Sequence, residues 1–177
     1  MSSLKLKIST PVQPTPKGLG FYQIEDGSLY VPIGGTFASR RFFSYIDSPI
    51  SRFDLDKEGR LMFMELSVPK TRWKIIDKLM PPEVVEPADI HWLDFRKSIV
   101  EPELLTNKEN SRLLVKLSDE TPQFNYYLAD SIILQVSRST HACGIFVNEI
   151  IDDAGGRKIA AFRRELSGKM TPASGLS

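Results

Sequence analysis

Alternating apolar residues recur in two separated stretches of this chain, and this pattern constrains the fold more than any other feature. The two stretches are Leu29-x-Val31-x-Ile33 and Leu113-x-Val115-x-Leu117. A two-residue period places every second side chain on the same face of a β-strand. Each stretch therefore predicts a strand that buries one face and turns the other toward solvent.

The likeness between the two parts extends over longer segments. Glu65-Leu66 lies as far from Leu29 as Glu149-Ile150 lies from Leu113. The intervening matches pair Phe53-x-Leu55 with Leu134-x-Val136, and Leu61-x-Phe63 with Ile145-x-Val147. One copy would hold three or four short strands, which is too little sheet to bury its own apolar face. We therefore predict two pseudo-repeated antiparallel meanders packed together; chance likeness between alternating strands is the alternative.

Turn and helix signals complete the predicted fold, which is mainly β with minor α. Asp26-Gly27 and Lys57-Glu58-Gly59 each separate two apolar runs, as in β-hairpins. One short helix is expected near 71–80, because its apolar residues have helical spacing and Pro81-Pro82 would end it. Residues 158–162 are expected to form a closing strand or a short helix.

Four segments are expected along the chain. Residues 1–82 would form the first β unit, with an N-terminal strand and the short helix, and 83–110 a packed bridge interrupted by prolines. Residues 111–166 would form the second β unit, and the small polar residues of 167–177 predict a mobile tail. A chain of 177 residues is long enough for one core shared by both units.

Two motifs in the first copy form a longer pattern. They are Tyr22-x-x-Glu25-x-x-x-Leu29-Tyr30-Val31 and Asp54-x-Asp56-x-x-Gly59-Arg60-Leu61-x-x-Met64-Glu65-Leu66. This pattern resembles a short bacterial domain of unknown function. The second copy keeps Leu113-Leu114-Val115-Lys116-Leu117-Ser118-Asp119 and Glu149-Ile150 but departs from the pattern at the turn. The resemblance covers somewhat more than half of the chain and implies a small β-meander; it brings no catalytic residues.

Composition limits the cellular setting and the partners. Lys and Arg number 23 and Asp and Glu number 22, so no overall charge favours nucleic acid or an anionic membrane. The single cysteine, Cys143, allows no intramolecular disulfide and suits a reducing compartment. The sequence has no apolar run long enough to span a bilayer and no secretory pattern at its start. We therefore predict a cytoplasmic protein without membrane insertion.

The acidic turn after residue 53 has the spacing of a calcium-binding loop. Asp54, Asp56, Glu58 and Glu65 fall where an EF-hand loop places oxygen ligands, and Gly59 lies at its glycine position. Prolines on both sides argue against the two helices that flank such a loop. The alternative is a hairpin with an acidic turn, in which an arginine pairs with Glu65.

Two basic clusters are candidates for partner binding. They are Arg157, Lys158, Arg163 and Arg164 near the C-terminus, and Arg40-Arg41 in front of Phe42-Phe43. Basic residues beside aromatic ones can bind single-stranded nucleic acid through phosphate contacts and base stacking. A solvated strand face, or an acidic protein partner for the C-terminal cluster, explains these residues as well.

No recognisable catalytic set occurs in the sequence. His141 and Cys143 could form a thiolate pair, but a loop histidine beside a buried thiol is the alternative. Phosphate-binding loops and a nucleophile elbow are absent, and no cofactor is expected. We predict a non-catalytic binding or assembly module that acts through a protein partner or self-association. Nucleic-acid binding through the C-terminal basic cluster and calcium binding at the acidic turn are the alternatives.

Overall fold

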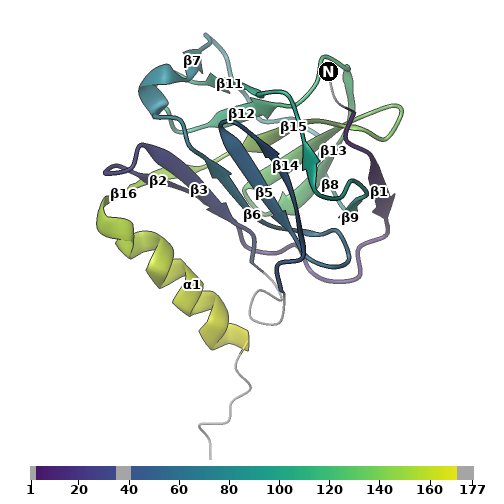
Figure 1. Cartoon of the computed structure of the whole chain (residues 1–177), viewed down its shortest axis with the longest axis horizontal. Coiled ribbons are helices and arrows are strands. Elements are labelled where there is room, and N and C mark those ends of the chain that lie inside the picture. Colours follow the sequence, from purple (N-terminus) through teal and green to yellow (C-terminus); the bar gives the residue numbers. More distant parts are fainter. Residues whose placement is uncertain (1–2, 35–40, 171–177) are drawn as a thin grey trace, which may run out of the picture.

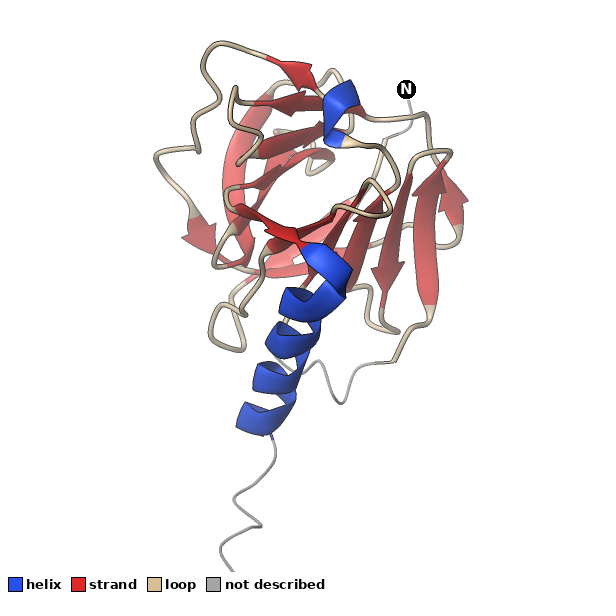
Figure 2. Ribbon diagram, turned by 90° about the vertical axis from the view of Figure 1, so that its left-hand side faces the viewer, coloured by secondary structure: helices blue, strands red, loops and turns tan. Residues whose placement is uncertain are grey.

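The computed structural model describes residues 3–34 and 41–170. Within those residues the protein has two seven-stranded sheets, a two-stranded sheet, one α-helix and two short 3-10 turns. Figure 1 labels these elements, and Figure 2 shows the helix lying outside the layers of strands. The predicted fold class, mainly β with minor α, is confirmed.

Sheet A has the strand order β10-β4-β5-β6-β3-β2-β16. Its strands are β2 (Gly20–Gln23), β3 (Ser28–Pro32), β4 (Ser44–Ser48), β5 (Ser51–Leu55), β6 (Leu61–Leu66), β10 (Lys97–Ser98) and β16 (Ile150–Asp153). Strands β2 to β6 are antiparallel to one another where they pair. The edge strands β10 and β16 are parallel to their neighbours β4 and β2.

Sheet B has the strand order β7-β11-β12-β15-β14-β13-β8. Its strands are β7 (Lys74–Ile75), β8 (Glu86–Pro87), β11 (Glu103–Thr106), β12 (Leu113–Lys116), β13 (Pro122–Ala129), β14 (Ile132–Ser137) and β15 (Ala142–Val147). Strands β11 to β15 pair in antiparallel fashion. The edge strands β7 and β8 are parallel to β11 and β13.

Sheets A and B share one strand order when one of them is read in reverse: β4-β5-β6-β3-β2 of sheet A correspond to β13-β14-β15-β12-β11 of sheet B. The corresponding strands also run in the same relative directions. Five antiparallel strands occupy the centre of each sheet, and a short parallel strand lies at each edge. Strand β7 follows β6 of sheet A along the chain but pairs with β11 of sheet B. Strand β16 follows β15 of sheet B but pairs with β2 of sheet A. We call this arrangement the strand exchange. Each sheet receives one edge strand from the part of the chain that follows the last central strand of the other sheet.

The strand register corrects part of the sequence match between the two halves. Leu29 lies opposite Leu66 in sheet A, as Leu113 lies opposite Val147 in sheet B. Leu66 thus takes the place in sheet A that Val147 has in sheet B, whereas the sequence pattern had assigned that place to Phe63. Leu66 lies 37 positions after Leu29, whereas Val147 lies 34 positions after Leu113, so the equivalent residues are displaced by three positions.

The match between two glutamates also fails in the structure. Glu65 belongs to β6, but Glu149 lies in the turn between β15 and β16. The two carboxylates therefore occupy different places relative to their sheets. The shared strand order is an observation on the fold; descent of the two halves from one duplicated unit stays a prediction.

A single apolar core lies between sheets A and B. Its fully buried members include Leu29, Val31 and Phe53 from sheet A and Val115, Leu134 and Ile145 from sheet B. Fully burying a side chain of this size contributes roughly 1.5–3 kcal/mol. Because each sheet covers the inner face of the other, neither face is left in contact with water.

A two-stranded ribbon adds apolar side chains to the same core. Strand β1 (Leu6–Ser9) pairs antiparallel with β9 (Asp89–Trp92). Leu6 and Trp92 are both buried in the core cluster. The bridge that contains β8, β9 and β10 begins at the edge of sheet B and ends at the edge of sheet A. It therefore links the two sheets a second time, away from the strand exchange.

One α-helix, α1 (Arg157–Met170), covers part of the outer face of sheet A. The ring of Phe162 lies 5.3 Å from the ring of Phe21 in β2. The 3-10 turn η2 (Ala154–Gly156) precedes the helix. Residues 167–170, which the sequence placed in a mobile tail, are helical, and 171–177 lie outside the described residues.

The structure corrects the helix predicted near 71–80. This segment contains the 3-10 turn η1 (Lys70–Arg72), then β7 and an extended chain. Trp73 is buried in the main core, whereas Leu79 packs in a separate cluster on sheet B. The N–H of Ile76 donates to a carbonyl of β11. The apolar residues have helical spacing, but two different surfaces bury them, and an extended chain is needed to reach both.

Gly59 provides a test of how tightly the β5–β6 hairpin packs against β9. Its φ is +84°, and a Cβ at this position would collide with the carbonyl oxygen of Trp92. We expect Gly59→Ala to lower the free energy of unfolding by about 3 kcal/mol, because left-handed strain and the backbone collision add. Urea denaturation followed by tryptophan fluorescence measures this loss.

Gly155 supplies the matched control. Its φ is +66°, but the nearest atoms to an added Cβ lie 4.0 Å away. Gly155→Ala should therefore cost about 1 kcal/mol, from backbone strain alone. Equal losses for the two variants would show that the contact with Trp92 is loose.

Candidate functional site

Exposed aromatic side chains lie beside the edge of sheet A that β10 and β4 form. Phe42 and Phe43 come just before β4, and Phe95 lies between β9 and β10; their exposed fractions are 51%, 48% and 53%. The rings of Phe43 and Phe95 contact each other with centroids 5.3 Å apart. Together with Tyr45 of β4, these side chains form what we call the aromatic patch. Large apolar side chains that remain exposed in a cluster indicate an interaction surface.

Two guanidinium groups lie over rings of the aromatic patch. Arg52 of β5 lies 5.3 Å from the ring centre of Phe42 and 4.8 Å from that of Tyr45. Arg96 lies 5.2 Å from the ring centre of Phe95. A guanidinium within about 6 Å of a ring face is attracted by the π-electrons. The cations therefore help to hold the rings in fixed orientations.

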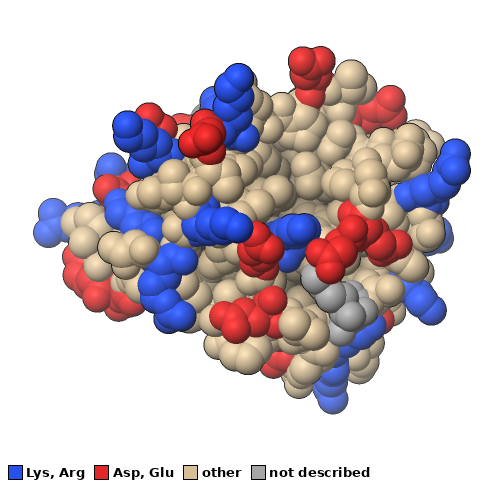
Figure 3. Space-filling view, turned by 90° about the horizontal axis from the view of Figure 1, so that it is seen from above, with Lys and Arg blue, Asp and Glu red and all other residues tan. Residues whose placement is uncertain are grey.

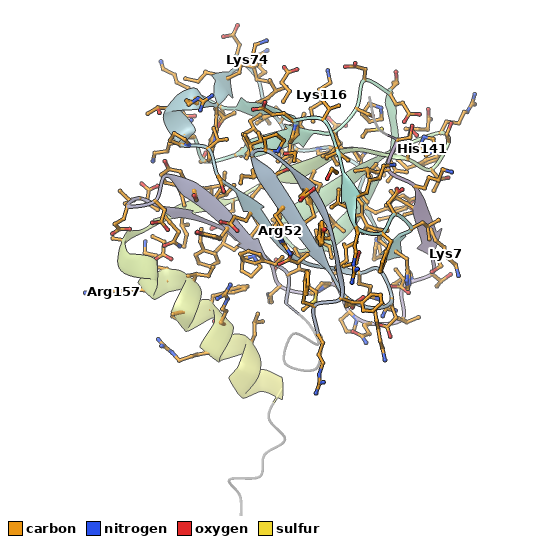
Figure 4. The ribbon with its side chains drawn as sticks, in the orientation of Figure 1. Lys7, Arg52, Lys74, Lys116, His141 and Arg157 are labelled. Atoms are coloured by element: carbon orange, nitrogen blue, oxygen red, sulfur yellow. The ribbon has the colours of Figure 1, made fainter. Side chains whose placement is uncertain are left out.

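A carboxylate holds Arg52 in place from the side. The Nε of Arg52 donates to Oδ1 of Asp54 at 2.8 Å, and this hydrogen bond raises the pKa of Arg52 above its usual value. Figure 4 shows Arg52 on β5, well separated from Arg157 at the start of α1. The candidate site thus contains a charged, fixed guanidinium in a partly apolar setting.

The backbone of Arg96 has an unusual conformation. Its φ is +48°, in the left-handed region that residues other than glycine rarely adopt. Its N–H donates to Oγ of Ser44 at 2.9 Å. Strained residues of this kind persist where the surrounding structure holds them, and they gather at functional sites. The strain directs the chain so that Phe95 meets Phe43.

The four residues predicted to bind calcium do not converge on one point. Asp54 bonds Arg52, and Oδ1 of Asp56 accepts the N–H groups of Glu58 and Arg60 at 3.0 and 2.9 Å. Asp56 therefore shapes the hairpin turn. Within residues 3–34 and 41–170, no group of three or more metal-ligating side chains could hold an ion. The geometry gives calcium binding no support, and it stays a prediction.

Glu65, the fourth of these residues, lies at the other end of β6. It is the register partner of Arg52 on β5 and of Tyr30 on β3. Burial and the nearby Glu65 carboxylate raise the pKa of Tyr30. Arg52 thus lies opposite Glu65 in the adjacent strand, while its Nε bonds Asp54; an ion pair between an arginine and Glu65 stays a prediction.

Arg60 takes part in a different ion pair that the sequence did not suggest. Its Nε and Nη2 donate to the two oxygens of Asp89 at 2.9 and 3.1 Å. The ring of His91 also meets Asp89, with Nε2 2.9 Å from Oδ2. The bonds from Arg60, followed by the contribution of His91, lower the pKa of Asp89 from 3.8 to about 2. This pair joins the β5–β6 turn to β9.

The basic residues predicted near the C-terminus do not share one face. All four residues are exposed, and the guanidinium of Arg163 lies 5.5 Å from the ring centre of Phe63. Positions 157 and 164 are seven residues apart and share a helix face, but position 158 lies a third of a turn away. Nucleic-acid binding by this cluster stays a prediction.

Buried Asp153 fixes the start of this basic helix. Its carboxylate oxygens accept the N–H groups of Lys158 at 2.8 Å and Ile159 at 3.1 Å, and Oδ2 also accepts a bond from the Gln23 amide. This is the role of a helix N-cap. The pKa of Asp153 is lowered: burial acts to raise it, but these hydrogen bonds outweigh burial.

His141 and Cys143 lie close together but do not form an activated nucleophile. Nδ1 of His141 faces the Glu120 carboxylate at 3.1–3.2 Å, while Sγ of Cys143 points to the His141 carbonyl oxygen at 3.7 Å. Burial, and then the charge of Glu120, raise the pKa of Cys143. A thiolate is therefore disfavoured at neutral pH.

The sequence pointed to part of the aromatic patch and missed the rest. Phe42 and Phe43 were noted beside Arg40-Arg41, of which Arg40 lies outside the described residues. Phe95 and Arg52 come from distant segments, and no local motif links them to Phe42. A partial signal was the pair Phe95-Arg96, which places an aromatic residue next to a basic one, as Arg41-Phe42 does.

No protein-family model and no curated protein matches this chain. The resemblance to a short bacterial domain therefore stays a prediction. Among the described residues, no helix has the length and apolar character required to cross a membrane. On the face seen in Figure 3, acidic and basic side chains are interspersed.

Asp89 should make stability depend on acidity. Its folded pKa of about 2 lies below the ordinary 3.8, so its contribution is present above pH 4 and is lost as the pH falls toward 2. The shift corresponds to roughly 2 kcal/mol. We expect Asp89→Asn to lose about that amount at pH 7, with the difference from the wild type shrinking as the pH falls from 4 to 2.

Urea denaturation between pH 2 and 7 measures this dependence. Asp119→Asn serves as the control, because the Asp119 side chain is 74% exposed beside Lys116. Its difference from the wild type should stay small at every pH. A loss in the free energy of unfolding of Asp89→Asn that does not change with pH would contradict the lowered pKa of Asp89.

Cys143 should react slowly with alkylating reagents. It is 2% exposed and its pKa is raised, so little thiolate is present and little of it is accessible. We expect iodoacetamide at pH 8 to modify it at least roughly tenfold more slowly than free cysteine. The denatured chain should react at the rate of free cysteine. A native rate equal to that of the denatured chain would overturn this reading.

Proposed function

We propose that this protein is a non-catalytic binding module that uses the aromatic patch to bind a protein partner. The proposal rests mainly on the exposure of Phe42, Phe43 and Phe95 beside one edge of sheet A, where Phe43 contacts Phe95 and Phe42 contacts Arg52. Covering these rings would remove a large apolar area from water, which is the main driving force of association. A cytoplasmic location, expected from the single cysteine, belongs to the same proposal.

The composition of the patch supports a protein partner. Aromatic residues and arginine are enriched at protein–protein interfaces, and a few of them commonly supply most of the binding energy. Arg52 and Arg96 are already held against rings. Little side-chain freedom would then be lost on binding, and this reduces the cost of association.

The charge of this surface distinguishes between a protein partner and nucleic acid. Asp54 pairs with Arg52, and Asp94 pairs with Lys97 next to Arg96. Nucleic-acid binding depends on cations that are free to neutralise phosphates. Pairing with carboxylates balances the charges of Arg52 and Lys97, so the mixed surface favours a protein.

Affinity purification with a matched pair of variants tests the proposal. Phe43→Ser with Phe95→Ser removes two of the four rings of the patch, whereas Ile24→Ser with Val84→Ser removes two apolar side chains that are 52% and 72% exposed elsewhere. All four positions are exposed, so both variants should fold. We expect the partner recovered with the wild type and the control to fall at least roughly tenfold with the patch variant, as for interface hot spots.

Two results would contradict the proposal. The first is equal recovery of the same proteins by the wild type and the patch variant. The second is a monomer in analytical ultracentrifugation that retains no protein from extracts of its host.

A further inference from the structure

A proline-rich segment crosses the end of the sandwich and borders a small, partly open cleft. This strap, residues 11–16, connects β1 to β2, and the carbonyl of Pro16 accepts the N–H of Asp130 at 2.9 Å. The N–H of Gly18 donates to Oδ1 of the same aspartate at 3.1 Å. The strap is therefore anchored to the β13–β14 turn. We call the space that it covers the strap cleft.

The strap cleft is small, and polar and apolar atoms line it in similar proportion. Its volume is about 70 Å³. A cavity needs roughly 10–15 Å³ of such space to hold one water, so the cleft can hold several waters or one small organic molecule. Its apolar walls include Ile33, Leu61, Ile90 and Leu128, besides the prolines of the strap. An apolar cavity with a few polar groups is the usual form of a ligand site.

The Arg60–Asp89 pair provides the polar wall of the strap cleft. Asp89 already accepts two bonds from Arg60 and faces Nε2 of His91, so its oxygens are occupied. Arg60 uses Nε and Nη2 for this pair, and among the described residues its Nη1 takes part in no hydrogen bond. The guanidinium thus retains N–H donors, while its charge is balanced by Asp89.

We propose that the strap cleft binds a small, uncharged carbonyl compound with an apolar body. The carbonyl oxygen would accept a bond from Arg60, and the apolar body would lie against the strap and the core residues below it. A carboxylate would need to lose its water and approach Asp89, which costs more than desolvating a neutral carbonyl. A positively charged amine that approached Asp89 would also lie close to the guanidinium of Arg60. Repulsion between these two charges disfavours a cationic ligand.

The pairing with Asp89 prepares Arg60 for this role. Two hydrogen bonds fix the guanidinium, and Asp56 fixes the backbone of Arg60 at 2.9 Å. A donor that is already held in place loses little freedom when a ligand binds. The cleft is separate from the aromatic patch, so this proposal does not depend on the proposed protein partner.

Ligand titrations followed by methyl NMR test the proposal on the whole chain. The probe is N-methylpyrrolidone, a compact cyclic amide, compared with cyclopentanecarboxylate as an anion and N-methylpyrrolidine as a cation. We expect saturable shifts of the methyl groups of Ile33, Leu61 and Leu128 with the amide, and at least roughly tenfold weaker binding of both charged analogues.

Two variants separate binding from folding. Arg60→Lys keeps the charge but removes the fork of donors, and it should weaken amide binding about tenfold, as for one lost hydrogen bond. Thr15 is exposed on the strap and lines the cleft, so Thr15→Trp should fill the space and abolish binding without disturbing the ion pair. Ile24→Trp, at an exposed position away from the lining residues, is the control and should bind as the wild type does.

Three outcomes would overturn the proposal. One is the absence of saturable shifts with the amide, and another is unchanged amide affinity in Thr15→Trp. The third is tighter binding of the carboxylate than of the amide, which would assign the cleft to anions.

Discussion

Burial of two apolar sheet faces against each other is the interaction on which the rest of this structure depends. Leu29 and Val31 from one sheet and Leu134 and Ile145 from the other belong to one buried cluster. A sheet of five central strands with one exposed apolar face is not stable alone in water. The parallel edge strands, the bridge and the β1–β9 ribbon are all additions to this central contact.

The rigid sandwich presents two surfaces with different chemistry. The aromatic patch is a group of exposed rings, and the strap cleft is a small, partly open cleft. In both places a guanidinium is fixed by a carboxylate, Arg52 by Asp54 and Arg60 by Asp89. Such pairing keeps the donor geometry of arginine while cancelling its charge. For the partner and the ligand proposed above, recognition would then depend on shape and hydrogen bonding more than on net charge.

Local sequence signals predicted the features that depend on local interactions. Asp26-Gly27 marks the turn between β2 and β3, and apolar alternation marks the central strands, because turn geometry and side-chain period are set by neighbouring residues. The segment 71–80 was misassigned because Trp73 and Leu79 are buried by different surfaces. The aromatic patch needed Phe95 to meet Phe43 across a long stretch of chain, and no pattern in one sequence encodes that meeting.

The strand exchange has a consequence for how the chain is made. The N-terminal half emerges first from the ribosome, but sheet A lacks an edge strand until residues 150–153 arrive. Domains generally fold as units during synthesis, and here the unit includes a strand that is translated after every strand of sheet B. The edge of β2 therefore stays unpaired until β16 has been made. An open strand edge of this kind can pair with other chains, so the order of synthesis exposes β2 for longer than the rest of sheet A.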